Sequence, residues 1–263
     1  MSTIDRNGVT LAYEDVGVGA PPMLFVHGAY CTRADFVSLV AHYRPQHRVI
    51  AVDLRGHGES DTPDQVYSVS AFADDLAWLC AQLGVHRPIV VGHSLGGQVA
   101  LQLAADHPEL PAAIVALDST IAPPDGTGDM LQPFTDAMTT PGYLEALHQF
   151  MAVTVLPTDT RTHAAGVLDR MNTVPQHVVA STWINGLVGW DSAPAASACR
   201  VPFLYIDHGA PNCDLARLAE LCPQLTVDRT DGVGHWALLE APDQVMSIVD
   251  RFLEATIDQG VPR

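Results

Sequence analysis

One short segment of this sequence has the residue types of a nucleophile held at a sharp turn. Gly92-His93-Ser94-Leu95-Gly96-Gly97 follows the apolar run Ile89-Val90-Val91 and precedes a stretch rich in helix-forming residues. A serine at a tight strand-to-helix turn sits in strained backbone, and glycines are needed wherever a side chain would collide. We therefore predict that Ser94 is a nucleophile, presented above a helix N-terminus that favours developing negative charge.

A serine hydroxyl of ordinary acidity needs a base beside it, and His235 is placed to be that base. The segment Gly232-Val233-Gly234-His235-Trp236 lies between the short apolar strand Leu225-Thr226-Val227 and the last helical stretch. A histidine in such a loop can reach the carboxyl edge of a parallel sheet, and its place after the serine fits the chain order Ser, Asp or Glu, His. The alternative is a loop histidine without a catalytic role.

The loop after the first core strand is expected to complete the site. His27-Gly28-Ala29-Tyr30 follows the apolar run Met23–Val26. In this topology that loop donates one backbone N–H to an oxyanion, and the residue after the nucleophile donates the other. We assign the Ala29 and Leu95 amides to these roles. Cys31 lies nearby but has no glycine-bounded turn to present it as an alternative nucleophile.

The rest of the chain must supply the elements that position these residues. Asn7-Gly8 between two alternating segments predicts an N-terminal hairpin. Short unbroken apolar runs, which are typical of strands covered on both faces, alternate with helical windows and therefore predict a mostly parallel sheet with helices on both faces. The expected strands are residues 23–26, 49–52, 89–91, 113–117 and 203–206. The expected helices are residues 69–83, 95–105 and 242–253.

Residues 121–200 break this alternation and form what we call the cap segment. It contains no convincing strand, opens with Pro123-Pro124-Asp125-Gly126, and is rich in Met, Phe and Trp. We expect several helices that cover the carboxyl edge of the sheet, with residues 1–120 and 201–263 as the core. Helices that pack against the core without covering a site are the alternative. Its large apolar side chains, some in the core and others facing a pocket, are Met130, Leu131, Phe134, Met138, Tyr143, Phe150, Met151, Trp183, Ile184, Leu187 and Trp190.

Four motifs in a fixed order together resemble the α/β-hydrolase superfamily, in its small esterase, lactonase and haloperoxidase-like branch. They are His27-Gly28, the segment Asp53–Ser60, the segment Gly92–Gly97 and Gly234-His235. The likeness covers nearly the whole chain outside the cap segment. It implies an α/β-hydrolase fold and a catalytic triad, with Asp53–Ser60 as a structural loop, and it says little about the substrate.

The acid of the triad departs from the usual pattern of that family. The resemblance leads us to look for Gly-x-x-Asp after the strand 203–206, but the position three after Gly209 is Asn212. Some branches place the acid after the strand that follows the nucleophile helix, where Asp118 stands 24 residues beyond Ser94 (118 − 94). We favour Asp118, which would orient and stabilise the imidazole. Asp214, a candidate helix cap, and Asp207 stay open as alternatives.

Composition narrows the classes of partner. The 263 residues carry 13 Lys+Arg and 30 Asp+Glu, for a formal charge of −17, which disfavours binding to nucleic acid or to an anionic membrane surface. The N-terminus does not resemble a signal peptide, and five scattered cysteines fit reduced thiols, so we expect a cytoplasmic protein. No metal-ligand spacing is present among the 12 histidines, and no cofactor is expected. The oligomeric state, a homodimer included, is left open.

The sequence thus predicts a serine hydrolase acting on a neutral, hydrophobic ester or lactone of modest size. The same site would also suit C–C bond hydrolysis, perhydrolysis with a carboxylate and peroxide, or cofactor-free oxygenation. A different class of function is a non-catalytic ligand receptor built on this fold.

Overall fold

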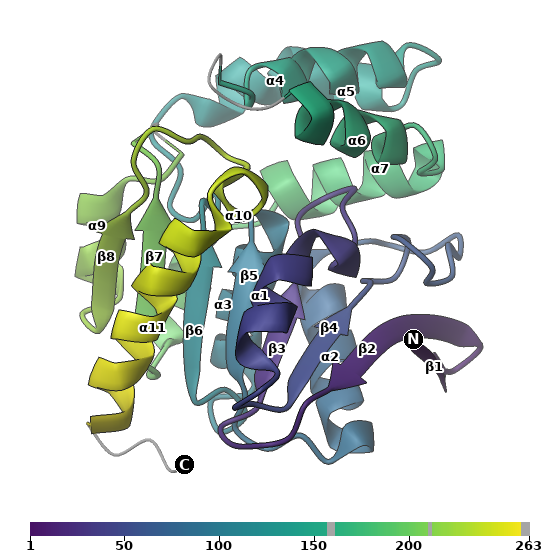
Figure 1. The fold of residues 1–263 in the computed structure, drawn as a ribbon. Helices are drawn as coiled ribbons and strands as arrows, with labels where there is room; N and C mark the ends of the chain where they lie inside the picture. The colour runs from purple at the N-terminus through teal and green to yellow at the C-terminus, as the bar shows by residue number, and fades with distance from the viewer. Residues whose placement is uncertain (157–160, 210–211, 259–263) are drawn as a thin grey trace.

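A single eight-stranded sheet forms the centre of the molecule in the computed structural model (Figure 1). The structure describes residues 1–156, 161–209 and 212–258, without side chains for 161–165 and 257–258. The strands run in the order β1-β2-β4-β3-β5-β6-β7-β8, and all neighbours from β4 to β8 are parallel. The strands are β1 Ser2–Arg6, β2 Val9–Val16, β3 Met23–Val26, β4 Val49–Val52, β5 Ile89–His93, β6 Ala113–Leu117, β7 Phe203–Asp207 and β8 Leu225–Arg229.

The N-terminal hairpin and the five core strands are confirmed. β1 and β2 pair antiparallel around Asn7 and Gly8, whose φ values of 55° and 84° are those that a tight hairpin turn requires. β5 and β7 each extend beyond the expected runs, to His93 and Asp207. The sheet is therefore mostly parallel, with an antiparallel pair at one edge.

Helices cover both faces of the sheet, as expected for strands that are apolar on both sides. Residues 23 and 25 of β3 pack in a cluster with α1 and α11, whereas residues 24 and 26 pack with α2 and α3. The helices of the core are 3₁₀-helix η1 Arg33–Phe36, α1 Val37–Tyr43, α2 Val69–Leu83, α3 Leu95–Asp106, α9 Leu215–Leu221, α10 Ala237–Glu240 and α11 Pro242–Asp258.

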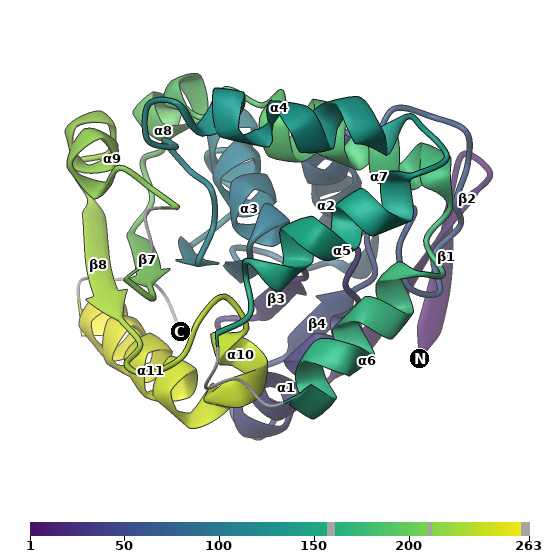
Figure 2. The ribbon, with the colours of Figure 1, turned by 90° about the horizontal axis from the view of Figure 1, so that it is seen from above.

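The described part of the cap segment consists of helices and the loops that join them, and it contains no strand. Its helices are α4 Thr127–Met138, α5 Tyr143–Ala152, α6 Arg161–Met171, α7 Gln176–Thr182, π-helix η2 Trp183–Val188 and α8 Ala193–Ala198. Figures 1 and 2 show α4, α5, α6 and α7 lying across the edge of the sheet at which the parallel strands end. This is the edge at which ligands bind in parallel α/β sheets.

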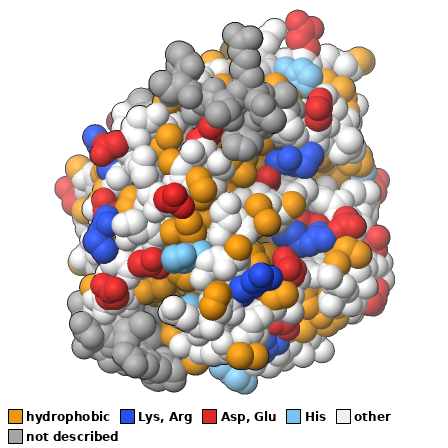
Figure 3. Space-filling model, viewed as in Figure 1, with side chains coloured by type: hydrophobic (Ala, Val, Ile, Leu, Met, Phe, Trp, Pro, Cys, Tyr) orange, Lys and Arg blue, Asp and Glu red, His pale blue; other side chains and the backbone are white. Residues whose placement is uncertain are grey.

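The surface has no large field of one sign on the face drawn in Figure 3, where acidic, basic and hydrophobic side chains are interspersed. Among the described residues, no helix combines the length and the apolar character needed to cross a bilayer.

Candidate active site

Ser94 stands at a strained turn between β5 and α3. Its φ of 51° and ψ of −118° lie in a region that non-glycine residues rarely occupy. The neighbouring glycines are required by contact: a Cβ at Gly92 would lie 2.1 Å from the Gly96 carbonyl oxygen, and one at Gly96 would lie 2.0 Å from the Val26 carbonyl oxygen. The sharp bend that the sequence motif predicts is therefore present.

The loop after β3 packs directly against this turn. A Cβ at Gly28 would lie 3.2 Å from the Cβ of Ser94 and 3.0 Å from Nδ1 of His93, so any side chain at this position would require its neighbours to shift by a few tenths of an ångström. Ala29 follows Gly28 and lines the same cavity as Ser94. Leu95 is the first residue of α3, where a backbone amide has no acceptor within its own helix.

His27 has a structural role in the same loop. Leu54 donates its amide to Nε2 of His27 at 3.0 Å, so the proton is on Nδ1, which donates to the Gly28 carbonyl at 2.7 Å. Burial lowers the pKa of His27 to about 4, so the ring is neutral at physiological pH. The ring thus ties the Gly28 turn to the start of the neighbouring loop.

The segment Asp53–Ser60 also has contacts typical of a structural loop. The Asp53 carboxylate accepts the backbone amides of Arg33 at 2.7 Å and of Glu59 at 2.9 Å, and it forms an ion pair with the Arg33 guanidinium. None of the segment's residues lines the cavity that contains Ser94.

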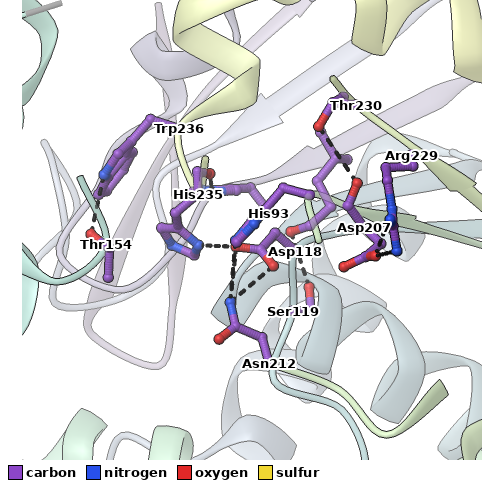
Figure 4. Close-up of polar contacts among 12 residues, drawn as sticks. His93, Asp118, Ser119, Thr154, Asp207, Asn212, Arg229, Thr230, His235 and Trp236 are labelled. Carbon is purple, nitrogen blue, oxygen red and sulfur yellow. Dashed lines mark hydrogen bonds and ion pairs between the residues drawn. The ribbon is translucent and has the colours of Figure 1, made fainter. Parts of the chain in front are cut away.

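His235 lies at the same cavity, held from two sides. Its Nδ1 is 2.5 Å from Oδ2 of Asp118, at the carboxyl end of β6 (Figure 4). The ring of His93, the residue before Ser94, lies 4.6 Å from the His235 ring between centroids. Burial lowers the pKa of His93 to about 3, so its neutral Nε2–H donates to the His235 carbonyl at 2.9 Å. The structure thus brings Ser94, His235 and Asp118 to one end of the sheet.

Asp118 is a buried carboxylate that stays ionised. Its exposed fraction is 4% and its φ is 42°, a second strained residue at the end of a strand. Burial opposes ionisation, yet hydrogen bonds from His208 and His235 outweigh it and hold the pKa of Asp118 well below its usual range. A carboxylate in this state can orient a neighbouring imidazole and stabilise its protonated form.

The two alternative acids are engaged elsewhere. Asp214 caps α9, since its carboxylate accepts the Arg217 amide at 3.0 Å. Asp207 forms a two-point contact with the Arg229 guanidinium, at 3.0 and 2.7 Å. Asp118, by contrast, contacts His235 directly.

Two site residues were not recognised as such from the sequence. His208 Nε2 lies 2.8 Å from Oδ2 of Asp118, and Asn212 donates its amide to both Asp118 oxygens at 3.0 and 3.1 Å. Both residues also line the cavity. The one sequence signal for these two residues is Asn212 itself, which stands where the resemblance predicts an aspartate.

Donor atoms of Asp118, His208 and His235 lie within 4.8 Å of one another, a spacing that would also suit a metal ion. Both histidine nitrogens are already at hydrogen-bond distance from the Asp118 carboxylate, and these contacts account for the cluster. Hydrogen bonding is therefore sufficient to explain the arrangement, and we assign no metal to it.

The cavity itself is small and mostly apolar. It has a volume of about 210 Å³, below the usual range of ligand pockets. Among the described residues that line it there is no Lys, Arg, Asp or Glu. Trp236 ties its wall to the cap segment by donating Nε1–H to Thr154 Oγ1 at 3.2 Å. The cap residues of the predicted apolar set that line the cavity are Met130, Leu131, Phe150, Met151, Trp183 and Leu187.

The thiol at this cavity is not a competing nucleophile. Cys31 lines the cavity but is buried, and burial together with the charge of Asp35 raises the pKa of its thiol well above the usual value. Because the thiolate is the reactive form, Cys31 is a poor nucleophile in this setting.

Comparisons with known proteins agree with this geometry. A family model described as alpha/beta hydrolase fold matches residues 21–242. A 2-(acetamidomethylene)succinate hydrolase of Mesorhizobium japonicum is 28% identical, over 96% of this chain and 94% of its own length. Among solved structures, Est816, described as an N-acyl homoserine lactone degrading enzyme, has a TM-score of 0.86 at 25% identity, with 95% of this chain and 100% of that chain covered. The enol-lactonase from Burkholderia xenovorans LB400 has a TM-score of 0.84 at 21% identity, with 96% and 100% covered, and is similar in fold.

Proposed function

The chain belongs to the α/β-hydrolase fold family, and from that premise we propose that it is a serine hydrolase of neutral, hydrophobic carboxylic esters or lactones. Its relatives include hydrolases of several bonds, so the bond must be argued from the site. The observation that supports the proposal most is the 2.5 Å contact of His235 with Asp118, beside a strained Ser94 on the same cavity. We further propose that the cap segment, residues 121–200, closes this cavity over the core.

In the proposed reaction, Nδ1–H of His235 donates to Asp118, which leaves Nε2 free to take the proton of the Ser94 hydroxyl. Oγ then bonds to the substrate carbonyl carbon, and the carbonyl electron pair moves onto oxygen. The Ala29 and Leu95 amides bind the resulting oxyanion, and such donors contribute about 3 kcal/mol each to stabilising the transition state. The protonated His235 carries a positive charge at this stage, which Asp118 offsets.

The intermediate then collapses toward an acyl-enzyme. His235 gives its proton to the leaving alkoxide as the C–O bond breaks, and the acyl group stays on Ser94. Water enters, His235 removes one of its protons, and a second oxyanion forms in the same position. Its collapse releases the carboxylic acid and returns the proton to Ser94. All groups in this scheme come from the chain or from water, so no cofactor takes part.

The walls of the cavity support the substrate class. A charged substrate group would lose its hydration without a Lys, Arg, Asp or Glu among the described lining residues to pair with it. Within the cap segment, the guanidinium of Arg170 is paired with the carboxylate of Asp35 at 2.5 Å. A volume of about 210 Å³ further favours a small acyl group.

Labelling and turnover test the proposal separately. A fluorophosphonate should label the wild-type protein at Ser94, and a series of p-nitrophenyl esters and simple lactones should be hydrolysed. Ser94→Ala should abolish both, while Ser197→Ala, a change at an exposed serine on α8, should leave both unchanged. Full turnover in Ser94→Ala would refute the covalent scheme. A protein that takes no label and hydrolyses no ester would refute the proposal and favour a ligand receptor or cofactor-free oxygenation on the same fold.

A further inference from the structure

The Asp118 carboxylate has three side-chain neighbours, and only one of them is the proposed base. His235 Nδ1 and His208 Nε2 approach the same oxygen, Oδ2, at 2.5 and 2.8 Å. Asn212 donates to Oδ1 at 3.0 Å and to Oδ2 at 3.1 Å (Figure 4). Both oxygens of the carboxylate therefore have hydrogen-bond partners other than His235.

Both additional neighbours come from the segment that follows β7. The end of β6 is anchored to β7 by the Asp118 amide, which donates to the Ile206 carbonyl at 2.9 Å. His208 and Asn212 then reach back from the β7 side to the carboxylate. The two carboxylates of this segment, Asp207 and Asp214, pair with Arg229 and cap α9 instead. The segment thus supplies hydrogen-bond donors to the carboxylate at the end of β6.

A carboxylate with a single partner can rotate about its Cβ–Cγ bond and lose its alignment. Hydrogen bonds to both oxygens remove that freedom, and in a buried site they also replace the water that the charge has lost. Water has little access to this carboxylate, because the Asp118 side chain is 5% exposed and the His208 side chain is 9% exposed. Misalignment of a catalytic group by about an ångström costs orders of magnitude in rate.

We propose that His208 and Asn212 are positioning residues, which keep the Asp118 carboxylate oriented toward Nδ1 of His235. This inference rests on the proposed function, in which His235 acts as the base. Neither residue needs to touch the substrate for this role, although both line the cavity. Their loss should therefore act on kcat rather than on KM.

The charges around His208 give this role a pH signature. His208 faces Asp118 and Asp207, the latter paired with Arg229, and it shares Asp118 with His235, whose ring contacts His93. Burial opposes protonation of His208, but its hydrogen bond and charge interaction with Asp118 outweigh this and raise its pKa. A protonated His208 shares the negative charge of Asp118 with His235, since both rings approach the same carboxylate oxygen, at 2.8 and 2.5 Å.

The test compares His208→Ala, His208→Gln and Asn212→Ala with a matched control, His148→Ala, at a half-buried histidine on α5 that does not line the cavity. Hydrolysis of a p-nitrophenyl ester is measured across pH, with thermal unfolding of each variant. His208→Ala and Asn212→Ala should lower kcat by about tenfold or more with KM nearly unchanged, the scale seen when groups that orient a catalytic ligand are lost. His208→Gln, which keeps an N–H donor, should recover part of this loss.

The pH dependence of kcat/KM should differ from that of wild type in His208→Ala, because the ring that shares the Asp118 charge with His235 is then absent. If His208→Ala does not fold, His208→Gln and Asn212→Ala carry the test. The inference is overturned if the wild-type protein takes the label at Ser94 and hydrolyses ester while these variants behave like His148→Ala, or change only KM and keep the wild-type pH profile of kcat/KM. Failure of the proposed function is distinct, since wild-type protein would then show neither labelling nor turnover.

Discussion

Asp118 and His235 are 117 residues apart in the sequence, and their side chains meet at 2.5 Å. The contact arises because parallel strands end at one edge of the sheet, so that the end of β6 and the loop after β8 are brought together. Ser94 stands at the end of β5, the strand next to β6. Three residues from distant parts of the chain therefore share one cavity without any of them being adjacent in sequence.

The first prediction concerns which aspartate serves His235. Asp118→Asn should lower kcat by about 10²- to 10⁴-fold, because an amide can neither fix the required tautomer of the imidazole nor offset its charge. Asp214→Asn should have almost no effect, since Asn caps a helix about as well as Asp. Steady-state kinetics of the two purified variants on one ester measure the difference. Equal losses in both variants, or a larger loss in Asp214→Asn, would reject Asp118 as the acid.

Much of the fold could be predicted because its signals are local. The Asn7-Gly8 turn, the apolar stripe of α2 from Val69 to Leu83, and the glycines around Ser94 each depend on neighbours within a few residues. The structure has these elements within a few residues of the expected bounds. The helix expected at 242–253 extends to Asp258, and its buried face continues as far as Thr256.

The neighbours of Asp118 could not be predicted in the same way. His208 and Asn212 become relevant only once the segment after β7 turns back toward the end of β6, a long-range arrangement without a periodic signal. The cap segment shows the same limit. Helical spacing indicates that Met138 and Met151 face inward, but only the structure tells that Met151 lines the cavity whereas Met138 is buried in the core.

A second prediction follows from the contacts of the Ser94 turn. Gly96→Ala would place a methyl group 2.0 Å from the Val26 carbonyl oxygen, and backbone on both sides cannot move away cheaply. We expect a loss of about 3 kcal/mol or more in the free energy of unfolding, or no folded protein. Gly128→Ala in α4 is the matched control, because nothing lies within 4 Å of its added Cβ. Urea denaturation should show Gly128→Ala equal to or slightly more stable than wild type. A normally stable Gly96→Ala would mean that the bend is looser than described.

A third prediction concerns the size of the acyl group. Phe150 lines the cavity and packs edge-on against Trp183, with ring centroids 4.7 Å apart. Phe150→Ala should enlarge the cavity and raise the kcat/KM ratio for a p-nitrophenyl octanoate over the acetate by about tenfold, since each accommodated methylene contributes on the order of 1 kcal/mol. Phe134→Ala removes an aromatic ring from the same cluster without reaching the cavity, so its ratio should stay near that of wild type. Equal shifts in the two variants would show that loosening of the cap segment, rather than cavity volume, sets chain length.

The last prediction concerns stability at acidic pH. His27, His57 and His93 are fully buried, and burial lowers their pKa values to about 4, 3 and 3. The unfolded chain binds protons at these positions near pH 6.5, whereas the folded chain does not until the pH reaches the lowered values. Between the ordinary and the lowered pKa values the unfolded state binds more protons than the folded state. The free energy of unfolding therefore decreases as the pH is lowered through this range, by about 1.4 kcal/mol per pH unit for each histidine.

Two other groups at the site do not cancel this loss. His208 has the opposite sign, because its raised pKa means that protonation favours the folded state, but it is one group against three. The pKa of Asp118 is lowered, so the stability that its ionised form contributes is lost only below the ordinary pKa of an aspartate. That is outside the pH range in which the three histidines act. Urea midpoints measured between about pH 7 and about pH 5 should decrease steadily in the wild type, where the free histidine value of about 6.5 is crossed. His57→Gln, which removes one titrating ring whose Nε2 has no hydrogen-bond partner, should flatten the dependence, and His148→Ala should not. A midpoint that does not change over this range would show that the three buried rings take up protons in the folded state.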